Sequence, residues 1–462
     1  MTADSIALGP TLAAPTPPPR PLGLFALIRT VRDSSIATYP QDAYERDFLD
    51  RSFLWAHAYI VNAPDGIKHV LLDNAANYVK TRLARRILEP GIGQGLLTNE
   101  GEVWKRHRRI MAPSFDPRSV VSYGPLMVEH TEAMLEQWDR LPDGAELMAD
   151  QAMMRLTLDI IAQAMFSSDA EDIAALVATG ADRYQTEVRP TLFDLLPLPS
   201  WLPRLADLKH PERIFSEFDR KIDRMMAERR QAGAAERPDL LGRLLAARDE
   251  ATDTGLSTKE IRDEIITIFM AGHETTSLAL TWTLYLLSQH PEIEAKLHRE
   301  LSDVLGGRAP RPDDVSKLRY ARMVIDEALR LYPPAHTLSR EAVAADEVSG
   351  HPIAAGSTIY IVPWLVHRHR RLWDQPDRFD PERFTPERRA ERPRFAYIPF
   401  GAGPRICIGA AFAITEAILI LASIAQRYRL RLKPGHVVEP RGLITLRPRT
   451  SVAMVLERRA IS

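Results

Sequence analysis

The sequence reads Phe400-Gly401-Ala402-Gly403-Pro404-Arg405-Ile406-Cys407-Ile408-Gly409 immediately before an apolar helix predicted from Ala410. Cys407 is the only cysteine in the chain. An isolated cysteine usually serves as a small apolar core residue, but this loop favours another role. Its glycines permit a tight backbone and the close approach of a flat ligand, and Pro404 stiffens it. Because Cys407 lies near Arg405 at a predicted helix N-terminus, we expect a lowered thiol pKa and a thiolate presented to a ligand.

Other chemistries are excluded by the residues that stand at the required positions. The third glycine of a dinucleotide-binding G-x-G-x-x-G pattern would fall on Ile406 here, and on Leu96 in the stretch that begins at Gly91. A zinc-protease H-E-x-x-H motif at His273 would need histidine in place of Ser277. A single cysteine also excludes an internal disulfide, a C-x-x-C redox pair and a multi-thiolate metal site built by this chain alone. The remaining interpretation is an axial thiolate to heme iron.

The loop resembles the heme-binding loop of the cytochrome P450 family, F-x-x-G-x-R-x-C-x-G. All five fixed positions match: Phe400, Gly403, Arg405, Cys407 and Gly409. Three further family motifs occur in the expected order, so that the resemblance covers the chain from residue 40 onward. It implies the cytochrome P450 fold, in which heme b (iron protoporphyrin IX) lies between the long central helix and the cysteine loop. Cys407 would be the metal ligand, and Phe400, Gly401 and Gly409 would contact the heme.

Helical periodicity dominates the chain, which predicts a mainly α fold with small peripheral β-sheets, of the α+β class. Predicted helices span residues 127–138, 152–166, 214–230, 240–248, 259–289, 293–305, 320–332 and 410–428. Predicted strands span residues 52–61, 347–362, 430–432 and 443–455. Residues 1–39 are interpreted as a proline-rich flexible tail and residues 40–462 as one catalytic domain, because no repeat or long linker divides them.

The composition limits the function classes. Lys and Arg total 60 against 61 Asp and Glu, which argues against a nucleic-acid binder and against an acidic disordered chain. The N-terminus has no basic and apolar signal pattern and no stretch that would anchor in a membrane. With one cysteine, the chain suits a reducing compartment, so we expect a cytoplasmic protein. We also expect a monomer.

The central helix contains a polar pair that needs an explanation. Between residues 265 and 289, His273 and Glu274 are the only ionisable side chains apart from Tyr285. A transmembrane helix is one reading, but a carboxylate at mid-bilayer is costly and no basic or aromatic residues mark the ends. A helix buried inside a large protein is the better interpretation. Ser257 followed by Glu260 forms a capping-box pattern at its start.

The same helix resembles the oxygen-activation motif of the family, through Ala271-Gly272-His273-Glu274-Thr275-Thr276. Thr275 can hydrogen-bond to the carbonyl oxygen of Ala271, which would loosen the helix enough to admit water or dioxygen. An alcohol beside a carboxylate can deliver the protons that cleavage of an O–O bond requires. We therefore expect Thr275 and Glu274 to be catalytic and Ala271 to contact the heme. For a buried threonine without a cofactor, local hydrogen bonding to the backbone would be the simpler reading.

Two further motifs resemble family features. Glu327 and Arg330 form an E-x-x-R pair, which the arginine of a P-E-R-F segment, Arg383, completes as a buried structural ion network. The W-x-x-x-R motif at Trp104 and Arg108 implies contacts with a heme propionate, and the resemblance adds two further propionate partners, Arg340 and Arg405. Lys105, Arg106 and Arg109 are read as a solvated basic face that would receive an acidic electron donor.

The resemblance also places the substrate pocket. Its lining would come from residues 88–97, 184–214, 335–338 and 443–446 and from the central helix. The candidate pocket residues are Leu96, Ala271, Thr275, His336, Thr337, Leu338 and Ile444. These are mostly apolar. His336 and Thr337 would either orient a polar group of the substrate or satisfy backbone groups.

Together these features predict a heme-thiolate monooxygenase that inserts one atom of O2 into an apolar organic substrate. No flavin, nicotinamide or iron-sulfur motif is present, so electrons would come from a separate ferredoxin with its reductase or from a flavodoxin-like donor, and NAD(P)H would act only indirectly through that partner. Three alternatives stay open: a peroxide-driven enzyme, a non-redox heme-thiolate enzyme and a heme-binding sensor. The Glu274–Thr275 pair argues against the first two, and the lack of a signalling module argues against the third.

Overall fold

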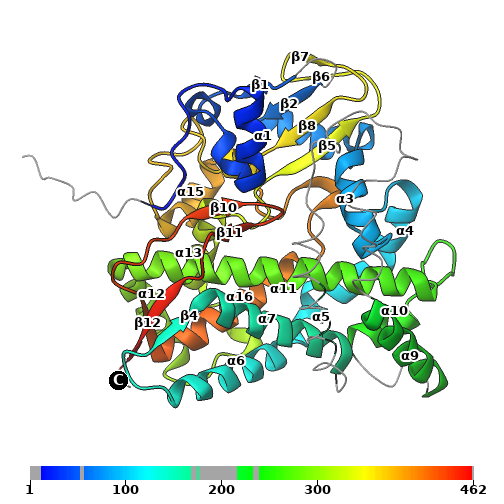
Figure 1. Cartoon of the computed structure of the whole chain (residues 1–462). Coiled ribbons are helices and arrows are strands. Elements are labelled where there is room, and N and C mark those ends of the chain that lie inside the picture. Colours follow the sequence, from blue (N-terminus) through cyan, green and yellow to red (C-terminus); the bar gives the residue numbers. More distant parts are fainter. Residues whose placement is uncertain are drawn as a thin grey trace, which may run out of the picture.

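The long helix α11 (Thr258–Gln289) crosses the centre of the molecule in the computed structural model (Figure 1). The structure describes residues 12–52, 57–167, 173, 176, 180, 216–232 and 239–459. At the start of α11 the Ser257 hydroxyl accepts a hydrogen bond from the backbone N–H of Glu260, and the Glu260 carboxylate accepts one from the N–H of Ser257. The predicted capping box is therefore present. At ~1.5 Å per residue the helix is about 48 Å long.

Burial along α11 is interrupted at one place. Every residue from Asp263 to Ser288 is buried except Met270, Ala271, Gly272 and Thr275. The interpretation of this segment as a buried helix is confirmed, and the motif predicted for oxygen activation coincides with the interruption. Among the described residues, the one helix apolar and long enough to span a membrane is α16 (Ala410–Arg427), and 67% of that helix is buried inside the protein.

Each helix that periodicity predicts is present among the described residues, with ends that differ by at most three residues. These are α6 (Gly124–Asp139), α7 (Ala149–Phe166), α9 (Ser216–Ala232), α10 (Leu240–Ala246), α11, α12 (Pro291–Leu305), α13 (Arg319–Leu331) and α16. Further helices are α1 (Leu24–Asp33), α2 (Pro64–Lys68), α3 (Arg82–Ile92), α4 (Gly101–Met111), α5 (Pro117–Val121), α14 (Pro363–Val366) and α15 (Pro386–Glu391). Figure 1 shows α6, α7, α9 and α10 on one side of α11 and most of the strands on the other.

Within the part of the chain that the structure describes, the strands form four small sheets, as the prediction of a mainly α fold with minor sheets requires. The largest has the order β1-β2-β8-β5-β3, in which only the β2–β8 pair is parallel. Its strands are β1 (Phe48–Asp50), β2 (Ala58–Val61), β3 (Tyr78–Val79), β5 (Leu338–Ala342) and β8 (Thr358–Ile361). The other strands are β4 (Glu146–Met148), β6 (Asp346–Val348), β7 (His351–Ile353), β9 (Tyr428–Leu432), β10 (Pro440–Gly442), β11 (Leu446–Pro448) and β12 (Ala453–Arg458).

The sequence-based boundary at residue 39 does not coincide with a structural boundary. Helix α1 lies within the segment interpreted as a tail. The carbonyl oxygen of Ala13 accepts a hydrogen bond from the Tyr332 hydroxyl (2.8 Å), and that of Pro18 accepts one from the N–H of Gln41 (3.0 Å). The part of this segment that the structure describes is therefore bonded to the rest of the protein.

Candidate functional site

The loop before α16 has a backbone that few sequences could adopt. The N–H of Cys407 donates to the carbonyl oxygen of Phe400 (2.9 Å), so the loop closes on itself just before the helix. Gly403 has φ +69°, and a Cβ atom there would lie 1.7 Å from the carbonyl oxygen of Leu71. Any side chain at position 403 would clash with that backbone. The glycine pattern is therefore explained by packing of the loop against the chain as well as by access to a ligand.

The environment of Cys407 differs from the prediction. Burial raises the pKa of the Cys407 thiol, and this outweighs the N–H of Gly409 and the charge of Arg108, which both act in the opposite direction. The residue still exposes surface to solvent. The protein around the sulfur, rather than the exposed area of the residue, determines its proton affinity, so the thiol pKa is raised. Within the protein alone, the predicted lowering of the thiol pKa is wrong, because burial outweighs the groups that lower it and Arg405 binds Glu100 instead.

The guanidinium of Arg405 lies over the ring of Trp104, with 4.2 Å from its carbon to the ring centroid. It also pairs with Glu100 and donates to the carbonyl oxygen of Asn99 (3.2 Å). Arg108, from the same helix α4 as Trp104, donates to the carbonyl oxygen of Ile406 (2.8 Å). Three of the predicted heme contacts thus meet at one place and attach α4 directly to the cysteine loop.

Lysine 80, which no motif marks, extends this group of cations. Burial, aided by Arg405, lowers the pKa of Lys80 to about 7, and its Nζ donates to the carbonyl oxygen of Leu96 (2.6 Å). Burial lowers the pKa of Arg340 to about 10, and the nearby positive charge of Arg405 acts in the same direction. Among the described residues, Glu100 offsets all three cations electrostatically, and Glu264 also acts on Lys80. A group of three cations that share one carboxylate fits a ligand with two carboxylates, such as the heme that the sequence predicts.

The two residues predicted to relay protons bind different partners. The Thr275 hydroxyl donates to the carbonyl oxygen of Ala271 (2.7 Å), as the sequence predicts, although α11 remains continuous through this turn. The Glu274 carboxylate accepts a hydrogen bond from the Thr445 hydroxyl (2.6 Å) and forms an ion pair with Arg447. His273 is buried, with Nδ1 at 2.5 Å from the carbonyl oxygen of Phe269. Burial lowers the pKa of His273.

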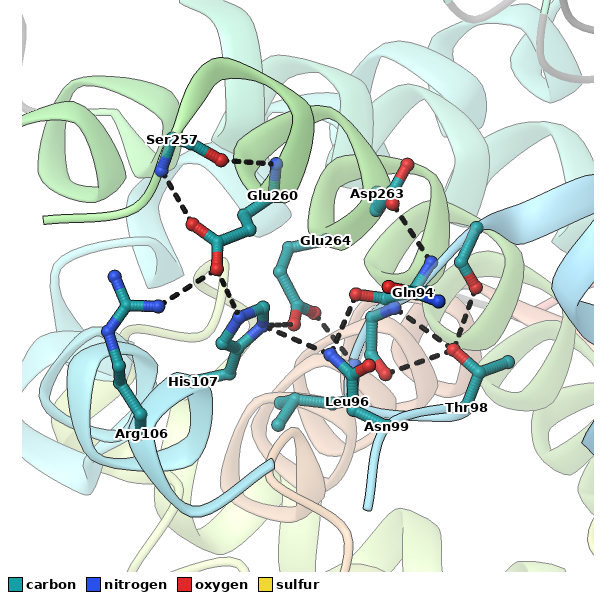
Figure 2. A network of polar contacts seen from close by, with 12 residues as sticks. Gln94, Leu96, Thr98, Asn99, Arg106, His107, Ser257, Glu260, Asp263 and Glu264 are labelled. Carbon is teal, nitrogen blue, oxygen red and sulfur yellow. Dashed lines mark hydrogen bonds and ion pairs between the residues drawn. The ribbon is translucent and has the colours of Figure 1, made fainter. Parts of the chain in front are cut away.

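Residues 93–99 are fastened to the first half of α11 (Figure 2). The N–H of Gln94 donates to Asp263 (2.9 Å), and the N–H of Leu96 donates to Glu264 (3.1 Å). A Cβ atom at Gly93 would lie 2.3 Å from the Asp263 side chain, and one at Gly95 would lie 2.2 Å from the Thr267 hydroxyl. Close approach to α11 therefore accounts for the glycine-rich stretch that lacks the dinucleotide pattern.

A buried histidine of α4 joins the same network, as Figure 2 shows. The Nδ1 atom of His107 lies 2.7 Å from Glu264, and its Nε2 atom lies 3.1 Å from Glu260. Arg106 also binds Glu260 (2.8 Å) and is 22% exposed, and Arg109 binds Asp249 (2.8 Å). The prediction of an exposed basic face is wrong for Arg106, which binds Glu260 of α11, whereas Arg109 is 45% exposed as predicted, although it also binds Asp249.

The predicted pocket residues fall into two groups. Ile444 is 54% exposed, and Leu96, Leu338, Ala271 and Thr275 are partly buried. His336 is buried and engaged by the protein, with Nε2 at 2.9 Å from the carbonyl oxygen of Leu443 and Nδ1 at 2.9 Å from the Thr337 hydroxyl. Burial lowers the pKa of His336 to about 4. In this structure His336 and Thr337 satisfy protein groups, and the predicted lining segment 184–214 lies outside the described residues.

The predicted ion network is assembled away from solvent. Arg330 binds both oxygens of Glu327 (2.6 and 2.8 Å), and Arg383 in the short 3-10 helix η12 (Pro381–Phe384) lies 3.3 Å from the same carboxylate. Arg330 also donates to the carbonyl oxygens of His367, Pro376 and Arg378. These bonds join α13 to the chain segment that leads into the cysteine loop.

Comparison with known proteins gives a consistent result. The family model described as "Cytochrome P450" matches residues 16–451. A solved structure described as the cytochrome P450DA heme domain superposes with a TM-score of 0.83 at 27% identity, covering 97% of this chain and 99% of that chain. The mainly helical architecture with small sheets is therefore as predicted.

Among curated relatives, cyclooctatin synthase from Streptomyces melanosporofaciens is 36% identical and covers 84% of each chain. Cyclooctat-9-en-7-ol 5-monooxygenase from the same organism is 33% identical and covers 82% of each chain. Pentalenene oxygenase from Streptomyces avermitilis is 36% identical over 77% of this chain and 78% of its own. The chain is thus similar to bacterial oxygenases over most of its length.

Proposed function

Because this chain belongs to the cytochrome P450 family and is a cytochrome P450 monooxygenase, we propose that it inserts one oxygen atom of O2 into an apolar organic substrate with electrons from a separate protein. The single observation that carries the proposal is the presentation of the lone cysteine, Cys407, beside a group of cations that share one carboxylate. That arrangement suits an iron porphyrin with two propionates.

Family membership implies heme bound through a thiolate, and we assign Cys407 as its ligand and heme b as the cofactor. Lys80, Arg108, Arg340 and Arg405 would hold the propionates, together with Trp104. Phe400, Gly401 and Gly409 would form the surface on which the ring rests. When bound, heme supplies the activation of dioxygen and the transfer of one oxygen atom. The thiol proton must leave Cys407 on binding, because the thiolate is the metal ligand.

Two neighbouring side chains of α11 would handle protons. Thr275 lies at the only interruption in the burial of α11 between Asp263 and Ser288. Its hydroxyl, now bonded to Ala271, can turn toward the reacting oxygen and donate a proton. Glu274 would replace that proton after taking one up from solvent, which reaches the partly exposed side chain of its partner Arg447. Ala271 leaves room for the substrate and dioxygen.

The proposed substrate class is argued from the predicted pocket residues and from the names of the relatives. Leu96, Leu338 and Ile444 are apolar and retain exposed surface. His336 and Thr337 are already bonded within the protein, so they would offer the substrate little polarity. Relatives named for pentalenene and cyclooctat-9-en-7-ol are consistent with an apolar, unsaturated substrate. We propose that this chain oxidises a compound of that kind, by hydroxylation or a related reaction.

The electron donor would be ferredoxin with its reductase or a flavodoxin-like protein, so that NAD(P)H acts only through that partner. The chain holds a single cysteine, which suits the reducing cytoplasm. We propose a cytoplasmic protein on this ground, and a monomer.

The first test is the absorption spectrum of the purified protein, reduced and then saturated with carbon monoxide. A strongly red-shifted Soret band is expected, and a C407H variant should lose it while it retains bound heme. Titration with pentalenene and with cyclooctat-9-en-7-ol should then shift the spin state of the ferric protein. A histidine-type spectrum of the wild-type protein, or no heme after supplementation, would contradict the proposal. Product formation with hydrogen peroxide but not with reductant and O2 would favour a peroxide-driven enzyme.

A further inference from the structure

Glu274 is fixed by a part of the chain far from its own helix. Its Oε1 atom accepts a hydrogen bond from the Thr445 hydroxyl (2.6 Å) and contacts Nη2 of Arg447. Glu274 and Thr445 are 5% and 7% exposed, whereas the Arg447 side chain is 30% exposed. The carboxylate is therefore buried, and the guanidinium that neutralises it lies between the carboxylate and solvent. We call Thr445 and Arg447 the Glu274 anchor.

The anchor belongs to the β10–β11 hairpin, which is itself attached to the core. The Trp282 indole N–H, two turns further along α11, donates to the carbonyl oxygen of Leu446 (3.1 Å). His336 binds the carbonyl oxygen of Leu443 (2.9 Å), and the N–H of Leu446 donates to Pro334 (2.9 Å). Because these partners are buried or in strand pairing, the hairpin holds its anchor residues at a fixed height along α11.

The tip of the hairpin is apolar and exposed, whereas the anchor residues and their partners are polar and mostly buried. Leu443 and Ile444 are 37% and 54% exposed, and they directly precede Thr445. These two residues are within the segment proposed to line the substrate pocket. A ligand that packs against the tip would therefore displace, or hold in place, the residue that bonds Glu274. The Nε atom of Arg447 is buried and has no hydrogen-bond partner among the described residues, so the guanidinium has capacity for a second arrangement.

We propose that Thr445 and Arg447 are positioning residues that hold the carboxylate of Glu274 on the β10–β11 hairpin, and that they couple contact at the hairpin tip to proton delivery through Thr275. In the present arrangement the hydroxyl of Thr275 bonds to Ala271 and the carboxylate of Glu274 bonds to the anchor. Delivery requires the Glu274 carboxylate to leave the anchor, take up one proton from solvent near Arg447, turn toward Thr275 and give that proton to it, after which the ionised carboxylate returns to the anchor. The inference rests on the proposed function.

The first experiment is a thermal double-mutant cycle on the full-length heme-loaded protein with E274Q, R447Q and the double variant. R447Q leaves a buried carboxylate without its cation and should lower Tm. E274Q in the same protein removes that penalty, so the two shifts should not add. R449Q is the matched control, because Arg449 lies just after the same hairpin but pairs with Asp33 and Glu439 near the surface. Additive shifts for E274Q and R447Q would overturn the proposal.

The second experiment follows the fate of electrons with a plant-type ferredoxin and its reductase as donor. Two protons and two electrons reduce O2 to hydrogen peroxide, and four of each reduce it to water. R447Q should raise the ratio of peroxide to oxygen consumed severalfold and enlarge the solvent isotope effect, because a positioned proton donor contributes on the order of 10²- to 10⁴-fold. R447K and T445S should restore most of the wild-type ratio, and T445V should resemble R447Q.

An R447Q protein with a wild-type peroxide ratio would contradict the anchor while leaving the monooxygenase assignment intact. A wild-type protein that consumes no O2 would contradict the proposed function instead, and the thermal cycle would still decide whether the anchor positions Glu274.

Discussion

Lys80 is a buried cation whose charge depends on what lies beside it. Burial lowers its pKa to about 7, so the side chain is largely neutral at pH 8.5 in the protein alone, whereas an unfolded lysine keeps its proton to pH ~10.4. Between these values the unfolded state binds more protons than the folded state, and this group makes the protein more stable as the pH rises. A neighbouring carboxylate ligand would raise the pKa of Lys80 again, because it favours the charged lysine.

We therefore predict that K80M weakens heme retention. A lost charge-assisted hydrogen bond costs about 1.5–3 kcal/mol, which corresponds to heme loss faster by roughly 10- to 100-fold. The rate of heme transfer to apomyoglobin measures this directly. K68M should transfer heme at the wild-type rate, since Lys68 pairs with Asp73 on the surface. Equal rates for K80M and wild type would exclude Lys80 from the propionate group.

At this scale the sequence identified the residues that local motifs mark and missed those that only the fold brings near. Arg405 and Trp104 lie in motifs and are in contact, and Arg108 bonds the carbonyl oxygen of Ile406 next to Cys407. Arg447 binds Glu274 across 173 residues of sequence, and Lys80 stands in no motif at all. The direction of the Cys407 pKa was wrong for the same reason, because burial comes from the tertiary structure while the nearby arginine was visible in the sequence.

Among the elements, the network in Figure 2 joins α4, α11 and residues 93–99, and the imidazole of His107 connects α4 to Glu260 and Glu264 of α11. Burial lowers the pKa of His107, but Glu264 and Glu260 together outweigh it and raise the pKa. Burial also raises the pKa of Glu264. The pKa of each partner is therefore raised, and the buried His107–Glu264 pair shares one proton. Because two carboxylates face one imidazole, we hold that the imidazolium is favoured.

We predict that H107F loosens the attachment of Leu96 to α11. Hydrogen exchange of the Leu96 amide should accelerate by about tenfold or more, because its acceptor Glu264 loses the contact with His107 that fixes it. K105M, on the exposed side of the same helix, should leave exchange unchanged. Unchanged exchange in H107F would mean that the loop is held without the histidine.

The pH dependence of the same variant has a definite sign. A histidine with a raised pKa contributes stability that is complete below its unfolded pKa of ~6.5 and is lost as the pH rises through the higher folded value. The Tm difference between wild type and H107F should therefore be larger at pH 6 than at pH 9. A difference that grows with pH would assign the stabilising proton to another group.

The predictability of the elements follows from how local their causes are. Helix α11 has its own capping box and continuous apolar residues, so its ends were predicted within one residue. Helix α3 was missed because it contains Pro90, which interrupts a helical pattern. Strand β5, which positions Arg340, was missed because it pairs with β3 and β8 in a sheet whose strands are far apart in sequence. Short strands depend on such partners more than on their own composition.

At the scale of the whole molecule, the Glu327 network connects the helical core to the segment that carries the cysteine. Arg330 and Glu327 are fully buried on α13, and Arg383 reaches the same carboxylate from η12. The N–H of Asp380 also donates to Glu327 (2.9 Å). The buried carboxylate of Glu327, which solvent does not reach, thus sets the position of residues 367–383. It thereby also sets the path by which the chain approaches Cys407.

We predict that E327Q destabilises the protein by about 3–5 kcal/mol, because it leaves two buried guanidinium groups without their carboxylate. Urea unfolding of the heme-loaded protein, followed by the Soret band and by far-ultraviolet circular dichroism, should show heme release before helix loss. The reason is that the network holds the segment before Cys407 more directly than it holds α11 or α16. E382Q is the control, since Glu382 lies beside Arg383 but pairs with Lys296 at the surface, and it should cost no more than about 1 kcal/mol. If E327Q and E382Q cost the same, the network would be a local ion pair, and the cysteine loop would be positioned by α4 and Arg108 alone.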